Sequence, residues 1–438
     1  MVRIPKSLVA GGIALGAALA SRRPRSRAPH PEWARGAVIY ELNPRQQTAE
    51  GTFKALLPRV VELKALGVDI VWFMPIHPIG EVARKGSLGS YYAVADYYGV
   101  NPEFGTLDDF RALVDAFHQQ GMHVIIDLVA NHTAWDSVLA KTHPEWFKRT
   151  RKGEFVQAHP EWHDVIALDY KKRPLREYMI QMMEYWVRDV GIDGFRCDVA
   201  DYVPTPFWEE ARERLERVKN VFMLAEAESP ELLRHAFDCD YGSEYFRLFH
   251  KIAEEKAGVD DLDALVKRHP HDYPHGAWRM MFTTNHDQNS WLESDVVMYG
   301  ADGARAFAIL AFALPGRPLI YSGQEVGNPK KLDFFEHDPI DWNGPGAHGM
   351  RAFYTKLCEI YHHYPSLQRG RMRRLATDAP VYAFWREAKG ETPVLLMANL
   401  SSTPSMWKFR KNRTELMSGA KIAQGPTELP PWSAFLIV

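Results

Sequence analysis

The chain has 438 residues, of which 46 % are hydrophobic and 25 % are charged, and its formal net charge is −2. This length and composition are those of an ordinary globular protein with room for one barrel-sized domain and accessory elements. The near-neutral charge gives no electrostatic support for nucleic-acid binding, so we expect no nucleic-acid partner. The three cysteines show no CxxC spacing, which excludes a disulfide framework or a zinc-finger-like cluster.

The N-terminal segment is interpreted as a targeting element. Arg3 and Lys6 precede a run of small and apolar residues from Leu8 to Ala20. This pattern is typical of a secretory signal peptide and is short for a membrane span. An arginine-rich stretch, an unusual flank for a translocated segment, follows at once: Arg22, Arg23, Arg25 and Arg27. We expect residues 1–30 to export the protein to the periplasm or the extracellular space. The alternative is an uncleaved N-terminal anchor, which would be the only route to membrane association.

From Ala37 onward, short apolar runs alternate with amphipathic stretches, which is the pattern of βα units around a parallel sheet. The expected strands are Val38–Leu42, Ile70–Pro75, His123–Val129, Gly194–Val199, Val221–Ala225, Ala236–Asp240, Arg279–Thr284 and Pro318–Ser322. The expected helices are Phe53–Leu66, Leu107–Gln119, Arg176–Val190, Pro206–Lys219 and Gly303–Leu314. Eight strands with interleaved helices predict an α/β fold, a closed (β/α)8 TIM barrel over residues 31–365.

Two further units are expected around this barrel. Residues 131–172, after the third strand, show little periodicity but contain several large aromatic side chains that need a place to pack, which predicts a short inserted subdomain. After residue 365 the pattern changes to short alternating segments such as Val381–Trp385, Val394–Asn399 and Ala434–Val438. Residues 366–438 are therefore predicted to form a small C-terminal antiparallel β domain.

Three of the apolar runs are followed by an acid. The segments are Gly194-Phe-Arg-Cys-Asp198, Met223-Leu-Ala-Glu226 and Thr284-Asn-His-Asp287. Acids at the C-terminal ends of barrel strands occupy the face where such barrels hold their chemistry. Cleavage of glycosidic bonds is a reaction carried out mainly by paired carboxylates, so this arrangement indicates glycoside chemistry.

With these motifs in order, the chain resembles the α-amylase family of glycoside hydrolases (family 13). The family's first motif corresponds to Asp127-Leu-Val-Ala-Asn-His132, and the second to Gly194-Phe-Arg-Cys-Asp198. The third corresponds to Glu226 and the fourth to Asn285-His-Asp287. One such motif alone would be weak, but four in order on the expected strands are specific. The resemblance covers roughly residues 35–435.

The resemblance implies a retaining mechanism with assigned roles. Asp198 is the candidate nucleophile, which forms a glycosyl-enzyme ester. Arg196, two residues earlier on the same strand, points to the same face and would keep Asp198 ionised. Glu226 is the candidate general acid/base, and its pKa is expected to be raised so that it holds a proton. Glu228, two residues further on, is the competing carboxylate.

The remaining candidate residues are assigned to the substrate. The resemblance gives Asp287 the role of third catalytic acid, which holds sugar hydroxyls and distorts the ring. His286 and His132 would donate hydrogen bonds to the same sugar, and Asp127 would support the arginine. Tyr92 matches the family's aromatic platform that stacks on the sugar, with Tyr91 as the alternative if the register differs by one residue.

Metal use and substrate are less constrained. No cofactor is expected for the chemistry, and a structural calcium near Asn131 is allowed by the resemblance but has no other support.

The leading hypothesis is hydrolysis of α-1,4-glucosidic bonds in α-glucans and maltooligosaccharides. The second is transglycosylation on the same scaffold, and the third is a non-catalytic sugar-binding or scaffold barrel. Asp201 and Tyr202 stand where many starch-degrading members have Lys-His, so the acceptor subsites are expected to differ.

Overall fold

The computed structural model describes residues 30–377 and 380–438. The predicted signal peptide or anchor, residues 1–30, thus lies outside the described residues except for its last position. Eight parallel strands close into a barrel in the order β1-β10-β9-β8-β7-β6-β3-β2. These strands are β1 Ile39–Leu42, β2 Ile70–Phe73, β3 His123–Leu128, β6 Gly194–Cys197, β7 Phe222–Ala225, β8 Cys239–Tyr241, β9 Trp278–Met281 and β10 Arg317–Tyr321. The predicted (β/α)8 barrel is confirmed, with strand ends shifted by a few residues.

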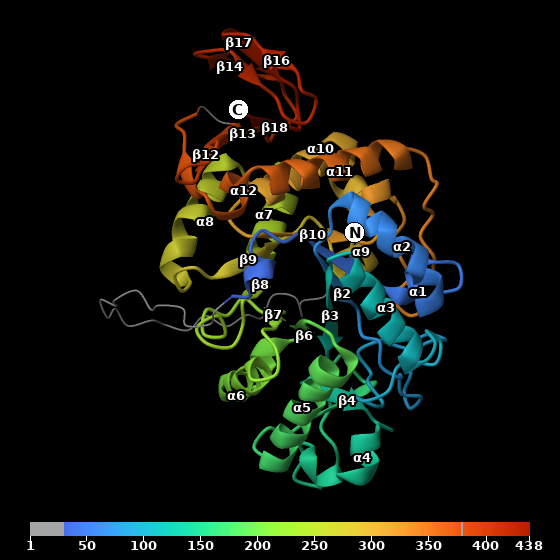
Figure 1. Cartoon of the computed structure of the whole chain (residues 1–438). Coiled ribbons are helices and arrows are strands. Elements are labelled where there is room, and N and C mark those ends of the chain that lie inside the picture. Colours follow the sequence, from blue (N-terminus) through green and yellow to red (C-terminus); the bar gives the residue numbers. More distant parts are fainter. Residues whose placement is uncertain (1–29, 378–379) are drawn as a thin grey trace.

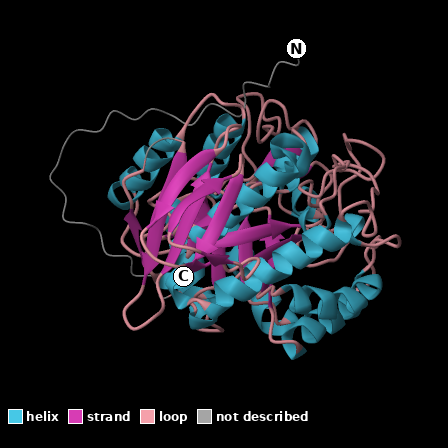
Figure 2. Cartoon of the chain, turned by 90° about the horizontal axis from the view of Figure 1, so that it is seen from above, coloured by secondary structure: helices cyan, strands magenta, loops and turns pink. Residues whose placement is uncertain are grey.

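Helices surround the barrel in the expected alternation (Figures 1 and 2). They are α1 Pro44–Gln47, α2 Phe53–Leu66, α3 Leu107–Gln119, α5 Arg173–Tyr185, α6 Thr205–Glu216, α7 Ser243–Ala253, α8 Val259–Asp272, α9 His286–Trp291, α10 Asp295–Ala313, α11 Ala347–His363 and α12 Pro365–Arg369. Short helical turns join them at Glu32–Ala34, Trp186–Val190, Ala200–Tyr202 and Gln324–Val326. Within the described residues, α10 alone is long and apolar enough to cross a membrane, but 61 % of it is buried inside the protein.

Local signals explain where the helices start and stop. The Thr106 hydroxyl accepts a hydrogen bond from the Asp109 N–H while the Asp109 carboxylate accepts one from the Thr106 N–H, which is the predicted capping box of α3. Helix α2 ends at Gly67, whose left-handed backbone (φ 99°) suits glycine. Helix α10 starts eight residues earlier than predicted, because it continues through a non-helical kink at Gly300 that interrupts the apolar periodicity.

The two additional units lie at opposite ends of the molecule in Figure 1. The segment after β3 contains β4 His132–Ala134, α4 Val138–Thr142, a turn at Pro144–Trp146 and β5 Val165–Ala167. The C-terminal strands are β11 Arg371–Arg374, β12 Val381–Glu387, β13 Val394–Asn399, β14 Ser405–Phe409, β15 Arg413–Thr414, β16 Lys421–Ile422, β17 Gly425–Leu429 and β18 Ser433–Ile437. They form an antiparallel sheet, β11-β12-β13-β18, and two antiparallel pairs, β14-β17 and β15-β16. The main sheet packs on α10 through β13 and β18.

Candidate active site

Barrel register brings the first three motifs together at the C-terminal ends of the strands. Asp127 on β3 is the register partner of Arg196 on β6, and Cys197 on β6 is the partner of Ala225 on β7. Because Asp198 and Glu226 each follow those last residues, both leave the barrel at the same level. The close approach of β6 and β7 depends on Gly194, where an added Cβ would lie 1.9 Å from the Phe222 carbonyl oxygen.

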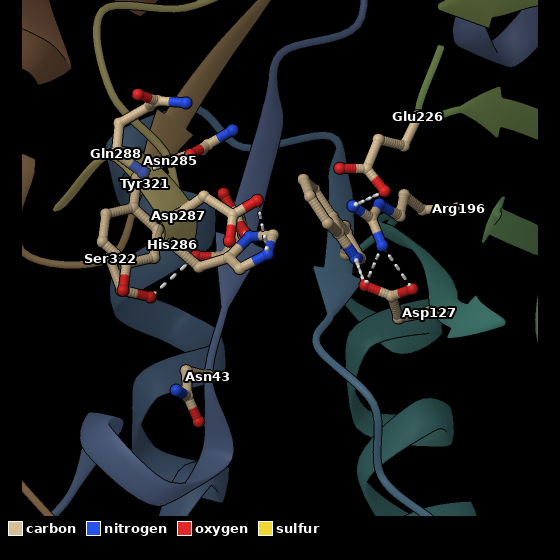
Figure 3. A network of polar contacts seen from close by, with 12 residues as sticks. Asn43, Asp127, Arg196, Glu226, Asn285, His286, Asp287, Gln288, Tyr321 and Ser322 are labelled. Atoms are coloured by element: carbon tan, nitrogen blue, oxygen red, sulfur yellow. Dashed lines mark hydrogen bonds and ion pairs between the residues drawn. The ribbon is translucent and has the colours of Figure 1, made fainter. Parts of the chain in front are cut away.

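Arg196 contacts the three acids of these strands, and Figure 3 shows it between Asp127 and Glu226. Its Nη1 donates to Asp127 at 2.8 and 2.9 Å and to Asp198 Oδ1 at 3.2 Å. Its Nη2 forms an ion pair with Glu226 Oε2 at 3.0 Å. The guanidinium is fully buried, so these charge interactions are weakly screened by water. One buried cation therefore balances a cluster of three carboxyl groups.

The two candidate catalytic carboxyls differ in pKa in a direction that the sequence did not predict. Burial and the neighbouring Glu226 carboxylate raise the pKa of Asp198 well above its ordinary value, against the effect of Arg196. Burial acts on Glu226 in the same direction, but Arg196 and the Val199 N–H outweigh it and lower the pKa of Glu226. The prediction of a raised pKa for Glu226 is therefore wrong for the site without substrate.

The turn after Asp198 is strained. Val199 has a left-handed backbone (φ 37°, ψ 51°), which is unfavourable for a β-branched residue. In this conformation its N–H donates to Glu226 Oε2 at 2.8 Å. Strain of this kind persists only where surrounding structure holds it, and it is concentrated at functional sites. The residue that follows the candidate nucleophile thus orients the candidate acid/base.

The fourth motif enters from β9 and the start of α9, across from Arg196 (Figure 3). His286 Nδ1 lies 2.5 Å from Glu41 Oε1, and its Nε2 lies 3.5 Å from Asp287 Oδ2. Burial favours the neutral ring, but Asp287 and Glu41 dominate and raise the pKa of His286 to about 9. His286 is therefore a buried imidazolium at neutral pH.

Tyr92 and Tyr91 are distinguished clearly. The Tyr92 hydroxyl lies 3.1 Å from Asp127 Oδ2 and 2.8 Å from His286 Nε2, and its partly exposed ring is stacked on that of His286. Tyr91 is fully buried, and its hydroxyl accepts a hydrogen bond from Asn43 at 2.9 Å. Of the two, only Tyr92 is placed among the candidate site residues.

His132 and the competing acid Glu228 are also placed. His132 Nε2 lies 3.9 Å from Asp198 Oδ2, and burial lowers the pKa of this histidine to about 4, so the ring is neutral. Glu228 is bound elsewhere: it accepts from the Glu244 N–H at 2.7 Å and from Arg247 at 2.6 Å. Glu226, and not Glu228, therefore contacts Arg196.

Asn131 offers little for a calcium ion. Its Nδ2 lies 3.2 Å from His132 Nδ1. Within the described residues, no group of three or more His, Cys, Asp or Glu side chains is arranged to hold a metal. Calcium prefers six to eight oxygen ligands, which include backbone and amide carbonyls, and no step below uses a metal.

Sequence reasoning missed two contributors to the site. Glu41 lies in an apolar strand, β1, and is fully buried against His286. Asp127 was found through the resemblance to the family's first motif, which does not include Glu41; an acid inside an apolar strand was the one signal available for it. The second is the ion pair between Lys85 Nζ and Asp164 Oδ1, at 2.9 Å, which joins the loop that carries Tyr92 to the inserted segment.

Comparisons with known proteins agree with this geometry. Residues 41–164 and 142–355 match the family described as "Alpha amylase, catalytic domain". A crystal structure of an alpha-amylase from Lactobacillus plantarum superposes with a TM-score of 0.84 and 31 % identity, over 92 % of this chain and 99 % of that one. Alpha-amylase MalA of Haloarcula japonica is 28 % identical over 89 % of this chain, which spans 58 % of that protein's length.

A second type of relative is also similar. The alpha-1,4-glucan:maltose-1-phosphate maltosyltransferase of Rhodospirillum rubrum is 28 % identical over 88 % of this chain. The chain spans 60 % of the length of that transferase. Proteins with hydrolase and transferase names are thus similar to this chain to the same degree.

Proposed function

The chain belongs to the α-amylase family, and from that premise we propose that it is a retaining glycoside hydrolase that cleaves α-1,4-glucosidic bonds of α-glucans and maltooligosaccharides. The observation that carries the proposal is the buried Arg196, within 3.2 Å of Asp127, Asp198 and Glu226. A retaining glycosidase needs two neighbouring carboxyl groups, one ionised to attack the sugar and one protonated to release the leaving group. This cluster supplies such a pair.

In the first step, an Asp198 oxygen forms a bond to the anomeric carbon while the bond from that carbon to the leaving oxygen breaks. The proton goes from Glu226 to the leaving oxygen. In the free site the pKa of Asp198 is raised and that of Glu226 is lowered, so bound substrate must favour protonation of Glu226. Positive charge that develops on the anomeric carbon favours the ionised form of Asp198. Repulsion from this ionised carboxylate then favours the protonated form of Glu226.

In the second step, Glu226 takes a proton from water, whose oxygen attacks the anomeric carbon and releases Asp198. Two inversions give net retention. His132, His286 and Asp287 are proposed to bind hydroxyls of the reacting sugar, and Tyr92 to stack on its ring. The neutral His132 can donate or accept, whereas the cationic His286 donates from both ring nitrogens, so the two histidines suit different hydroxyl contacts.

Transglycosylation is the second candidate. It differs only in that a sugar hydroxyl replaces water in the second step. Tyr202, just after the nucleophile motif, is 52 % exposed, and its ring stacks on Trp162 of the inserted segment at 6.4 Å. Exposed aromatic faces on the side of the acceptor favour a bound sugar over water. A non-catalytic barrel is disfavoured by the presence of every motif acid.

Export is proposed from the sequence alone. The apolar run Leu8–Ala20 supports it, with an uncleaved anchor as the alternative. N-terminal sequencing of the protein from soluble extracellular or periplasmic fractions and from membranes distinguishes the two. A new N-terminus close after Ala20 supports cleavage, whereas an intact Met1 in the membrane fraction supports the anchor.

Product analysis over time tests the enzymatic proposal, with end-labelled maltoheptaose as substrate and sucrose as a control. Shorter maltooligosaccharides with the α-anomer formed first, as seen by proton NMR, are expected. Longer products would favour transfer over hydrolysis. An initial β-anomer would exclude the retaining mechanism, and no reaction with either sugar would favour the non-catalytic barrel.

A further inference from the structure

A cavity of about 460 Å³ lies at the end of the barrel opposite to the catalytic residues. It is lined by Trp278 and Arg317, the first residues of β9 and β10. The catalytic acids follow the last residues of their strands, and the barrel strands are parallel, so the two sites are separated by the length of the barrel. The end of α8, the end of α12 and strand β12 complete the wall.

Two buried arginines line this cavity, Arg317 and Arg386, which are 4 % and 2 % exposed. Arg317 donates to the carbonyl oxygens of Ala34, Gly316 and Gln368 at 2.8–3.3 Å. Arg386 donates from Nε to the Gly370 carbonyl at 3.1 Å and from Nη1 to the Ala313 carbonyl at 2.5 Å. No hydrogen bond joins the Nη2 atom of either guanidinium to a residue described in the structure.

Neither arginine has an acidic partner among the described residues. The other buried arginines of the described chain each have a carboxylate partner: Arg45, Arg59, Arg196, Arg212 and Arg279. Burial lowers the pKa of Arg386 to about 10 and also lowers that of Arg317; the Tyr361 phenol lies near both, and the positive charge of Arg317 lowers the pKa of Arg386 further. Both arginines are still protonated at neutral pH. The Ala313 carbonyl ends α10 and contributes only the partial negative charge of a helix C-terminus.

The rest of the lining adds positive charge and no negative charge. Arg369 supplies that charge beside the imidazole rings of His269, His271 and His275, and no Asp or Glu in the described part of the chain lines the cavity. Arg369 is 67 % exposed and pairs with Glu391 at 2.5 Å, outside the lining. Buried charges are normally paired, because an uncompensated one costs several kcal/mol. The two buried arginines of this cavity therefore lack an anionic partner within the described chain.

We propose that this cavity binds a phosphate-type anion carried by a small organic phosphomonoester. Guanidinium groups bind phosphate oxygens through paired N–H donors, and the free Nη2 atoms provide such donors. The cavity volume is in the range of small-molecule sites and exceeds what a bare phosphate fills, so an organic group is expected beside it. Pro274 and Pro315, which also line the cavity, give that group an apolar contact.

The chain's own N-terminal segment does not suit this cavity. His30 stacks on Trp278 at 3.9 Å, so the chain reaches the cavity from that side. The preceding residues carry Arg22, Arg23, Arg25 and Arg27, which have the same charge sign as the cavity. Like charges repel, and a small anion is favoured over this segment.

Isothermal titration calorimetry of the full chain tests the proposal, with inorganic phosphate and glycerol 3-phosphate as probes at pH 7 and constant ionic strength. Glycerol 3-phosphate is chosen because it is not a sugar and avoids the catalytic residues. Saturable binding at one site per chain is expected, tighter for the ester. Arg317→Gln and Arg386→Gln should each weaken binding about tenfold or more, since each removes a charge-assisted donor pair.

Matched surface variants keep the test decisive if a buried variant does not fold. Arg369→Gln removes a lining charge and should weaken binding about two- to fivefold. Arg371→Gln, two residues away and paired with Glu387 outside the cavity, should leave the affinity unchanged. Absence of saturable binding by both probes, or equal affinity in the Arg369 and Arg371 variants, would overturn the proposal. Binding of phosphate without the ester would identify the free anion as ligand.

Discussion

The two ends of the barrel differ in the charged partners that surround a buried arginine. At the catalytic end, Arg196 is fully buried and lies within 3.2 Å of three carboxyl groups. At the other end, Arg317 and Arg386 are nearly as buried and donate to carbonyl oxygens, with no carboxylate partner among the described residues. The same side chain, with the same desolvation cost, therefore has an excess of negative partners in one place and none in the other.

This difference shows that burial alone does not define the role of an arginine. Around Arg196 one positive charge is shared among several acids, so one carboxyl in the cluster is easily protonated, which is what acid/base catalysis requires. Around Arg317 and Arg386 positive charge is left over, which is what anion binding requires. The charged groups around a buried arginine therefore determine whether it supports proton transfer or binds an anion.

The largest effect is expected from removal of a catalytic carboxylate. Asp198→Asn and Glu226→Gln should each lower turnover of maltoheptaose by several orders of magnitude, because the nucleophile or the proton donor is lost. Both substitutions are nearly isosteric, so circular dichroism and melting temperature should stay close to those of the native protein. Near-native turnover in either variant would show that the assigned roles are wrong. The loss should not extend to phosphate binding at the opposite end.

The comparison between the arginines predicts different stabilities. Arg196→Met should lower the free energy of unfolding by about 3–5 kcal/mol, because it leaves buried carboxyls without their cation. Arg386→Met removes an unpaired charge and should cost no more than about 1–2 kcal/mol, chiefly from the carbonyls it leaves without donors. Urea unfolding of both variants, without phosphate in the buffer, measures the difference. Equal losses would mean that Arg386 is compensated by a partner after all.

A pH profile sharpens the description of the catalytic end. The pKa of His286 is raised from 6.5 to about 9, so its charged form contributes stability that is complete below pH 6.5 and is lost as pH rises through 9. This contribution is on the order of 3 kcal/mol, at about 1.4 kcal/mol for each pH unit. Glu41→Gln removes one of the two acids that raise this pKa. We expect the alkaline limb of kcat/KM to move about one pH unit lower.

The control for this prediction is Glu325→Gln. Glu325 is also buried but accepts from the Tyr40 hydroxyl at 2.6 Å and pairs with Arg59, away from His286. Its variant should leave the position of the alkaline limb unchanged, whatever it does to stability. If Glu41→Gln and Glu325→Gln shift the limb equally, the contact between Glu41 and His286 does not control the titration.

Much of this architecture was predictable because local signals were strong. Buried parallel strands appear as continuous apolar runs, and the capping box at Thr106 and the glycine at position 67 mark helix ends without help from the rest of the fold. The acids of the motifs follow such runs directly. Their meeting at one end of the barrel needs only the rule that parallel strands share an edge.

Other features needed the closed barrel and were not predictable. Glu41 and His286 are 245 residues apart and meet only because β1 pairs with β10, which pairs with β9. The pKa order of Asp198 and Glu226 depends on the strained Val199 turn, for which valine gives no sequence signal. The sequence of β12 does not show which face of the sheet Arg386 occupies. Its lack of an acidic partner becomes visible only when α10 and β12 are packed together in the fold.

The smallest effect is expected at the edge of the catalytic end, in the ion pair between Lys85 and Asp164. Asp164 is 4 % exposed and Lys85 is 22 % exposed, so the pair is more protected than a surface pair but is still reached by water. Lys85→Met should raise KM for maltooligosaccharides about two- to fivefold with little change in kcat, because the pair holds the loop with Tyr92 against the inserted segment and takes no part in proton transfer. Lys171→Met, an exposed lysine in the same inserted segment without a described ion pair, is the matched control and should leave KM unchanged. A fall in kcat of several orders of magnitude would instead place Lys85 in the charge balance of the catalytic carboxyls. The contrast between the two ends of the barrel would then rest on Lys85 as well as on Arg196.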